Sequence, residues 1–264
     1  MPRFLAVRPP AGPAGIRLLC FHHAGAGAMT FAGWKRAVGP GVSVLPVRLP
    51  GRESRLREPR ITDGDQLVQE LTEDLGELLD EPEPYAFYGH SLGAMVAYRF
   101  AAHLVRTGRR PPLMLLAGAS PAPQLPSALL DGARALRPDA PDEELIRALG
   151  DEDSLPRELL ARPGWLSLTL ETLRADLMLA RSLRSAPAVP LPCPVRAFAG
   201  SQDQLVSPAE VSAWAHCTTA GFRMRTLPGA HFFVRGEELP RLVGEALHLE
   251  PVPAEAPTPP AAAS

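Results

Sequence analysis

The pentapeptide Gly-His-Ser-Leu-Gly at residues 89–93 is the feature that most constrains how this chain can fold. It follows the strand-like run 85–88, Tyr-Ala-Phe-Tyr, and precedes the helix-like run 94–100. A serine in a tight strand-to-helix turn takes up strained backbone angles, which requires that the residues two before and two after it lack bulk. The spacing therefore predicts a nucleophile elbow at Ser91, rather than a surface turn that happens to contain glycine and serine.

Apolar runs bounded by glycine and proline alternate with longer helical patterns along most of the chain. This alternation predicts an α/β fold with a mostly parallel central sheet flanked by helices. One helix is expected over 66–79, where leucines recur every three or four residues, with Thr62 or Asp63 as its N-cap. The expected strands are 16–21, 42–47, 86–88, 113–117, 195–199 and 223–227.

The alternation stops between about residues 124 and 186, where prolines punctuate short amphipathic pieces. An insertion after a central strand is typical of a helical lid over the catalytic edge; the alternative is a helical layer that only covers the sheet. We expect a single α/β domain over residues 1–249, with this insertion inside it. The tail 250–264 has too little apolar surface to offset its ordering entropy, so we expect it to be disordered.

Composition argues against several classes of protein. With 27 Lys and Arg, 29 Asp and Glu, and no basic tract, the chain does not resemble a nucleic-acid binder. It has no signal-peptide core and no run of 18 apolar residues, so we expect a cytoplasmic protein without a membrane partner. The cysteines Cys20, Cys193 and Cys217 are odd in number and lack metal-like spacing, so neither a disulfide scaffold nor a zinc site is expected.

A serine hydroxyl is a poor nucleophile near neutral pH and needs a base, which a third group must orient. His231 directly follows the last expected strand, and Asp203 follows the strand 195–199, so both should lie at the edge of the sheet that carries the serine. Asp176, within the insertion, is the competing acid, although pairing with an arginine explains it more simply. His90 should point away from the serine hydroxyl and serve packing or hydrogen bonding.

Acyl transfer also needs hydrogen-bond donors for the developing oxyanion. One should be the backbone N–H of Leu92, the residue after the serine, and the other should come from the loop after the first strand. That loop, residues 22–27, contains two glycines that let amides turn inward, and Ala24 N–H is the candidate. A phosphate-binding loop is the alternative, but neither GxxxxGK[ST] nor GxGxxG is present.

Together these residues resemble the type II thioesterases, the stand-alone α/β-hydrolases that accompany modular polyketide and nonribosomal peptide synthases. The resemblance spans nearly the whole chain. It is carried by FHHAGA at 21–26, LPGRE at 49–53, GHSLGA at 89–94, LRAD at 173–176 and PGAHFF at 228–233. The chain departs from the family in the first loop, with His22 in place of the usual proline and Ala26 in place of a frequent second glycine.

The resemblance implies an α/β-hydrolase fold with a helical lid and a triad of Ser91, Asp203 and His231, with oxyanion donors on Ala24 and Leu92. It implies that the enzyme hydrolyses aberrant or stalled acyl groups, through an acyl-serine, from the phosphopantetheine arm of an acyl or peptidyl carrier protein. No cofactor or metal is required, and the family leans toward a monomer.

Three other functions compete with this prediction. A broad carboxylesterase would act on small free esters, and a non-catalytic carrier-binding module would require a broken triad. A terminal thioesterase domain of a synthase is disfavoured by the initial methionine and the lack of an upstream carrier segment. Arg52, Arg55 and Arg57 are candidate contacts for an acidic carrier protein, unless they form a solvated charged face.

Overall fold

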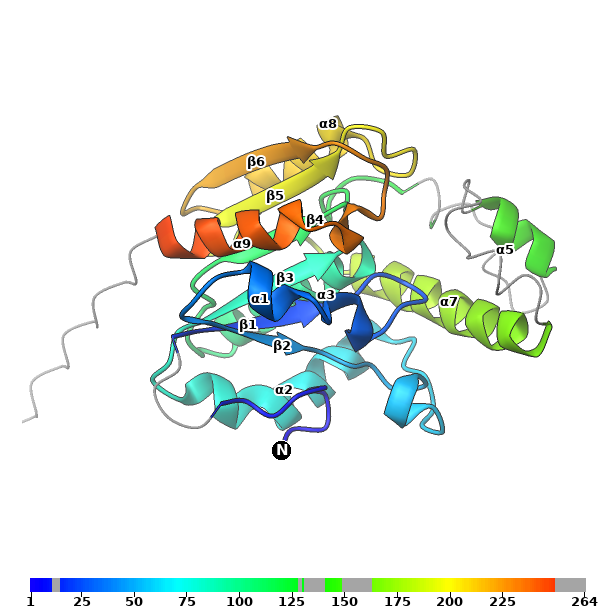
Figure 1. The fold of residues 1–264 in the computed structure, drawn as a ribbon, viewed down its shortest axis with the longest axis horizontal. Helices are drawn as coiled ribbons and strands as arrows, with labels where there is room; N and C mark the ends of the chain where they lie inside the picture. The colour runs from blue at the N-terminus through cyan, green and yellow to red at the C-terminus, as the bar shows by residue number, and fades with distance from the viewer. Residues whose placement is uncertain (11–14, 128–129, 131–140, 149–162, 250–264) are drawn as a thin grey trace, which may run out of the picture.

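Six parallel strands form the centre of the computed structural model (Figure 1). The structure describes residues 1–10, 15–127, 130, 141–148 and 163–249. The strands are β1 (Ile16–Phe21), β2 (Val42–Pro46), β3 (Tyr85–His90), β4 (Leu115–Gly118), β5 (Val195–Gly200) and β6 (Phe222–Leu227). Their order is β2-β1-β3-β4-β5-β6, and every neighbouring pair is parallel. The predicted α/β fold is confirmed.

The expected strands are all present, with ends that shift by one or two residues. The largest extension is in β3, expected to end at Tyr88, because Gly89 still pairs with Phe21 of β1 and His90 with Gly118 of β4. The direction of chain connections reverses between β1 and β3, which is where parallel sheets of this kind open a crevice at their carboxyl ends. The turn at 89–93 therefore starts from the middle of the sheet.

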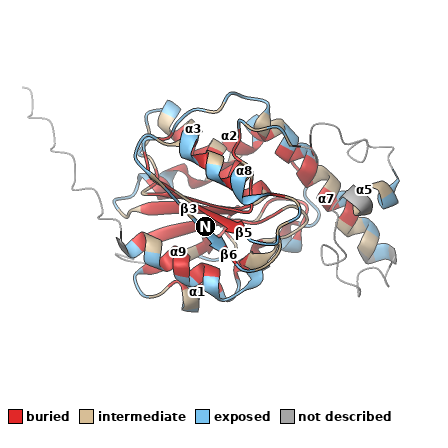
Figure 2. Cartoon of the chain, turned by 90° about the horizontal axis from the view of Figure 1, so that it is seen from above, coloured by how far each residue is buried: buried red, intermediate tan, exposed pale blue. Residues whose placement is uncertain are grey.

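Helices cover both faces of the sheet, so the strands are buried between two layers (Figure 2). One layer holds α2 (Gly64–Asp80), α3 (Leu92–Arg106) and α8 (Pro208–Ser212). The other holds α1 (Trp34–Ala37) and α9 (Glu238–Leu249). Short 3-10 helices are η1 (Ala28–Phe31), η2 (Glu53–Arg55), η5 (Ala213–Cys217) and η6 (Phe233–Arg235). Burial on both faces explains the mostly apolar sequences of the central strands β3 and β4, which are buried at every position, whereas the edge strand β6 is largely intermediate or exposed and carries two arginines.

Helix α2 begins two residues before and ends one residue after the expected helix 66–79. Of its two candidate caps, Asp63 is the one used, since its carboxylate accepts the backbone N–H of Gln66 at 2.8 Å. The cap satisfies a donor that would otherwise lack an intrahelical partner. The leucines that predicted the helix, Leu67, Leu71, Leu75 and Leu78, are buried.

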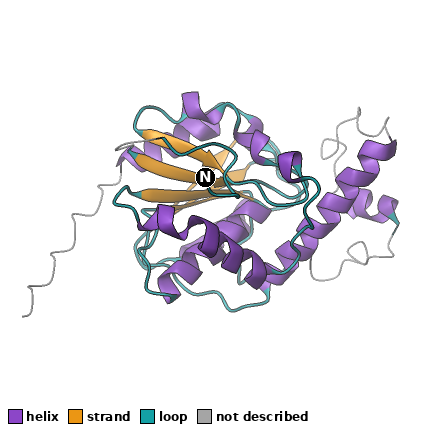
Figure 3. Ribbon diagram, turned by 90° about the horizontal axis from the view of Figure 1, so that it is seen from below, coloured by secondary structure: helices purple, strands orange, loops and turns teal. Residues whose placement is uncertain are grey.

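The insertion contains α5 (Asp142–Ala148) and α7 (Pro163–Arg184), which extend beyond the carboxyl ends of the strands (Figures 1 and 3). The expected short pieces are wrong for α7, a single helix of 22 residues. Pro163 stands at its first position, where proline is tolerated, and no proline interrupts it afterwards. Residues 128–129, 131–140 and 149–162 of the insertion, and the tail 250–264, lie outside the described residues.

All three cysteines are buried and free. Burial raises the pKa of the Cys20 thiol well above its usual range, and it raises the pKa of Cys193 and of Cys217 to about 12. Because the thiolate is the reactive form of cysteine, these side chains are packing groups with little nucleophilic character near neutral pH.

Candidate active site

Ser91 stands between the last residue of β3 and the first residue of α3, with φ of 54° and ψ of −116°. A non-glycine residue with such a positive φ persists only where its surroundings enforce it. The N–H of Ser91 donates to Gly118 O at the end of β4 (2.8 Å), and its carbonyl accepts the N–H of Ala94 (3.0 Å). These bonds fix the turn from both sides and hold it at the carboxyl edge of the sheet.

The glycines around Ser91 are required by close contacts between backbones. A Cβ on Gly89 would lie 2.1 Å from Gly93 O, and a Cβ on Gly93 would lie 2.0 Å from Phe21 O in β1. Both distances are far below van der Waals contact, and the obstructing atoms belong to the backbone. The steric explanation of the pentapeptide is therefore confirmed.

His231 and Asp203, from the loops after β6 and β5, contact each other directly. His231 Nδ1 lies 2.8 Å from Asp203 Oδ2, and the Asp203 side chain is fully buried. The other carboxylate oxygen, Oδ1, accepts the N–H groups of Leu205 (2.9 Å) and Val206 (3.0 Å). A carboxylate only accepts, so Nδ1 of His231 carries the proton and Nε2 is left as a base.

A cavity joins the serine to the histidine. Ser91, Leu92, His231 and Ala24 all line it. Ser120, Pro121, Ser127, Arg184 and Glu210 also line it, and its apolar part is formed by Met95, Leu130, Leu177, Ala180, Leu205 and Val206. The structure thus brings all five residues expected from the sequence to one place, Asp203 through its bond to His231.

The loop 22–27 after β1 carries Ala24 in a tight turn. Ala26 N–H donates to His23 O at 3.2 Å, and Gly25 has a φ of 74°, the left-handed region that favours glycine. Within the part of the chain that the structure describes, no hydrogen bond uses the N–H of Ala24 or of Leu92. Both amides are therefore available to an oxygen in the cavity.

His90 holds the backbone of His231 through a hydrogen bond. Its Nε2 lies 2.8 Å from the backbone oxygen of His231, and its Nδ1 lies 2.9 Å from the Tyr88 hydroxyl. The carbonyl can only accept, so Nε2–H donates to it and Nδ1 accepts from Tyr88. Burial lowers the pKa of His90 well below its usual range, which keeps the ring neutral. The expected hydrogen-bonding role of His90 is confirmed.

Two more histidines, His22 and His23, are buried in the loop after β1. Burial, with the neighbouring Arg52 guanidinium, lowers the pKa of His22 to about 3, and burial lowers the pKa of His23 to about 4. The Nδ1 of each ring donates to a backbone oxygen, of His23 (2.9 Å) and of Ala24 (3.0 Å) respectively. Both rings are thus neutral near physiological pH and hold the carbonyls of their loop.

Asp176 pairs with an arginine, as the simpler explanation predicted. Its Oδ1 lies 2.6 Å from Arg52 Nη2, and its Oδ2 lies 2.8 Å from Arg52 Nη1. It lies on α7 and makes no hydrogen bond to His231 among the described residues. Asp203 is therefore the acid that meets the histidine.

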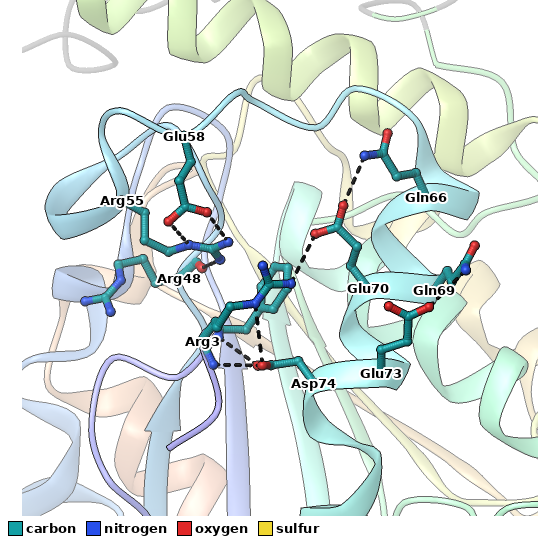
Figure 4. A network of polar contacts seen from close by, with 10 residues as sticks. Arg3, Arg48, Arg55, Glu58, Gln66, Gln69, Glu70, Glu73 and Asp74 are labelled. Atoms are coloured by element: carbon teal, nitrogen blue, oxygen red, sulfur yellow. Dashed lines mark hydrogen bonds and ion pairs between the residues drawn. The ribbon is translucent and has the colours of Figure 1, made fainter.

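Arg52 and Arg55 were expected either to contact an acidic carrier protein or to form a solvated charged face. Both predictions are wrong, since both side chains are buried. Arg55 donates from Nε and Nη2 to the Glu58 carboxylate at 2.9 and 2.6 Å (Figure 4), and its guanidinium lies 4.5 Å from the centre of the Phe4 ring. The same view shows Arg3 held by Asp74 and Glu70 of α2. Of the three arginines considered for docking, Arg57 alone is exposed.

Sequence reasoning missed two partners of the site. Tyr88 stands two residues before His90 on β3, a spacing that puts both side chains on one face of the strand, so this contact had a readable signal. The contact of Arg52 with Asp176 had none, because the residues are 124 positions apart and belong to a loop and a helix.

Within the described ranges, no cluster of three or more His, Cys, Asp or Glu side chains could hold a metal ion. The same part of the chain contains no helix with the length and apolar character needed to cross a bilayer.

A parallel sheet between helical layers, a strained serine after a central strand, and a later aspartate and histidine define an α/β-hydrolase. The model of the thioesterase domain family matches residues 16–248, so the chain belongs to the thioesterase family. The resemblance stated from the sequence is thereby confirmed, and the chain is an enzyme that hydrolyses thioesters.

Individual relatives match this chain over most of their length. The chain is 32% identical over 221 residues to the gramicidin S biosynthesis protein GrsT of Aneurinibacillus migulanus, covering 84% of each chain. It is 36% identical to RedJ, a thioesterase of the prodiginine pathway of Streptomyces coelicolor, with a TM-score of 0.76 over 90% of each chain. It is 29% identical to BorB, a type II thioesterase from the borrelidin cluster, with a TM-score of 0.78 over 92% of this chain and 97% of that one.

Proposed function

We propose that this thioesterase releases acyl groups from the phosphopantetheine arm of acyl or peptidyl carrier proteins, with Ser91, His231 and Asp203 as its triad. The observation that carries the proposal is the cavity lined by both Ser91 and His231, with His231 bonded to Asp203 at 2.8 Å. GrsT, RedJ and BorB are proteins of gramicidin S, prodiginine and borrelidin biosynthesis, which supports a role in polyketide or nonribosomal peptide biosynthesis. The enzyme would clear aberrant or stalled acyl groups there.

The first step is attack of the Ser91 hydroxyl oxygen on the thioester carbonyl carbon. His231 takes the hydroxyl proton at Nε2, because its Nδ1–H is held by Asp203. The buried carboxylate stabilises the imidazolium that forms, and it fixes the ring orientation through its own bonds to Leu205 and Val206. The electrons of the carbonyl π bond move onto oxygen, which becomes negatively charged.

The developing oxyanion is stabilised by the N–H groups of Ala24 and Leu92, which border the same cavity as Ser91. Leu92 is the first residue of α3, so its amide lies at the positive end of the helix dipole. Both donors are backbone groups and need little reorganisation when charge develops.

The tetrahedral intermediate then collapses. The carbon–sulfur bond breaks, and the pantetheine sulfur leaves and takes the proton from His231 Nε2. His231 is then neutral again, and the acyl group stays on Ser91 Oγ. A thiolate is a good leaving group, so proton donation by the imidazolium matters less than in amide hydrolysis. A water molecule, deprotonated by His231, attacks the acyl-serine and releases the carboxylic acid with the serine regenerated.

The apolar part of the cavity receives the acyl chain, and α7 forms one side of it through Leu177 and Ala180. We propose that α7 acts as part of a lid, which moves to admit the pantetheine arm. The enzyme needs no cofactor in this mechanism, since every proton transfer has a protein group. It acts as a monomer in the reducing cytoplasm, a compartment that suits its free cysteines.

The decisive measurement compares kcat/KM for an acetyl group loaded on a carrier protein with kcat/KM for a small free oxygen ester. The proposed function predicts the larger value for the carrier-bound thioester. A larger value for the free ester would contradict it and favour a broad carboxylesterase. A panel of carrier-bound acyl groups, from acetyl to longer and aminoacyl chains, would then define the preference for the acyl group.

A further inference from the structure

Two side chains from distant parts of the sequence meet beside the loop 22–27. Arg52 precedes η2, and Asp176 lies midway along α7. The Arg52 side chain is 8% exposed and that of Asp176 is 1% exposed, so the ion pair is shielded from solvent. Removing two charges from water is costly, and a buried pair is weak evidence for stability alone. Both residues stand in sequence blocks that mark the family, yet neither takes part in the steps above.

The Asp176 carboxylate binds the loop as well as the arginine. Its Oδ2 accepts the backbone N–H of Gly25 at 2.8 Å, in addition to Arg52 Nη1 at the same distance. Charge-assisted hydrogen bonds of this length are among the stronger ones in proteins. The Gly25 amide is therefore anchored to α7.

Arg52 binds a second peptide of the same loop, the one between Ala26 and Gly27. Its Nη1 also donates to the backbone oxygen of Ala26 at 2.8 Å. The pair thus holds an N–H on Gly25 and a C=O on Ala26, which lie on either side of the left-handed glycine of the turn. The Arg52 guanidinium can bind the Asp176 carboxylate and the Ala26 oxygen at once, because its donors form a rigid planar fork.

The turn transmits this constraint to Ala24. Ala26 N–H and His22 Nδ1 both donate to the His23 oxygen, at 3.2 and 2.9 Å. A trans peptide is planar, so fixing the His23 oxygen on one side fixes the Ala24 N–H on the other. A displacement of Gly25 and Ala26 would remove one of these bonds and tilt the Ala24 amide.

We propose that Arg52 and Asp176 are positioning residues: their ion pair holds the loop after β1 so that Ala24 N–H is aimed at the oxyanion. The inference rests on the proposed oxyanion role of Ala24. It also assigns a catalytic consequence to α7, because this helix carries Asp176 and must be docked for the donor to be in place.

The first test is Asp176→Asn, assayed with acetyl-N-acetylcysteamine, a small thioester that needs no carrier docking. Loss of one oxyanion donor typically lowers kcat 100- to 1,000-fold, so a misaimed donor should lower kcat roughly 10- to 100-fold. KM should change little, because the donor acts in the transition state. The affinity of an alkylboronic acid, which forms a tetrahedral adduct with the serine, should fall in parallel with kcat.

The second test separates positioning from folding. In the double variant Arg52→Met with Asp176→Leu no unpaired charge remains buried, so the fold should be retained and thermal melting should confirm it. The loop nevertheless loses its acceptor for Gly25 and its donor for Ala26, so kcat should still fall. A folded double variant with wild-type kcat and boronate affinity would overturn the proposal.

Ser182→Ala is the matched control. Ser182 also lies on α7 and its Oγ also accepts a glycine amide, Gly64 N–H at 2.9 Å, but away from the loop after β1. It should leave kcat unchanged, and an equal loss of kcat would show that general docking of α7 is responsible, against the proposal. If wild type and Ser91→Ala hydrolyse the thioester equally, the proposed function itself fails; full activity in the pair variants alone overturns only the positioning role.

Discussion

Two loops at the carboxyl edge of the sheet are held in opposite ways. The loop after β5 is held locally, because the Asp203 carboxylate accepts amides from Leu205 and Val206, two and three residues further on. The loop after β1 is held remotely, since its Gly25 amide is bonded to a residue 151 positions away. The difference teaches that the position of Asp203 is fixed by its own loop, whereas the position of the Ala24 amide depends on the packing of α7 against the loop after β1.

The largest expected effect comes from replacing Ser91, which lines the same cavity as Ala24 and His231. Ser91→Ala should lower kcat for a carrier-bound acyl group on the order of a millionfold, as loss of a triad nucleophile typically does. The replaced hydroxyl contributes little to packing, so thermal melting should be nearly unchanged. Turnover close to that of wild type would show that Ser91 is not the nucleophile and would contradict the proposed mechanism.

Asp203→Asn tests whether the loop after β5 is indeed self-contained. The asparagine oxygen can still accept the amides of Leu205 and Val206, but His231 loses its carboxylate and the tautomer that the carboxylate enforces. We expect kcat to fall on the order of 10,000-fold, with a melting temperature near that of wild type. A collapse of stability instead would show that this loop, too, depends on more than its local bonds.

Tyr88→Phe tests the support of His231 by His90, a residue distant from it in the sequence. The change leaves the buried Nδ1 of His90 without its donor, which should lower the free energy of unfolding by about 1–3 kcal/mol in urea titrations. It should also lower kcat, because His90 holds the His231 backbone. Tyr98→Phe is the control: its hydroxyl binds Val189 O at 2.7 Å, so stability should fall while kcat does not.

The smallest effect is a pH dependence of stability, to which His22 and His23 in the loop after β1 contribute together with the buried His90. The pKa of His22 is about 3 and that of His23 about 4 in the folded protein, against 6.5 for an unperturbed histidine. As pH falls below about 6.5, the unfolded chain binds protons that the folded protein does not, so stability falls by roughly 1 kcal/mol per pH unit for each ring. This loss continues down to the folded pKa values and fades out within about one pH unit above 6.5.

Urea unfolding at pH 7, 6 and 5 would measure this slope. His22→Gln removes one of the titrating rings while keeping a side-chain donor for the His23 oxygen, so its slope should be shallower than that of wild type. Equal slopes would show that acid sensitivity arises elsewhere in the molecule.

The parts of the fold and site that could be predicted are those with local signals. The strands were marked by apolar runs between glycine and proline, and the position before a leucine repeat limited the helix cap to Thr62 or Asp63, of which the structure uses Asp63. Asp203 and His231 could be expected to meet because each follows one of two neighbouring strands. These features could be predicted because each depends on the types and spacing of a few neighbouring residues, or on the order of the strands.

The remainder required the packed structure. The course of α7 decides which residues Asp176 meets, and neither its uninterrupted length nor its path across the strand ends follows from the spacing of prolines. For the same reason Arg52 was expected at the surface, although it is buried against that helix. A long-range pair between a loop and a helix leaves no periodic signature.

The three buried cysteines have a practical consequence for an enzyme whose proposed product is a free thiol. Disulfide exchange proceeds through thiolates, and burial raises the pKa of all three side chains far above neutral pH. The protein should therefore form no mixed disulfides with the pantetheine that it releases. A thiol-specific chromogenic reagent added during turnover should report the leaving group without titrating the folded enzyme, so the reaction can be followed continuously and without a reductant.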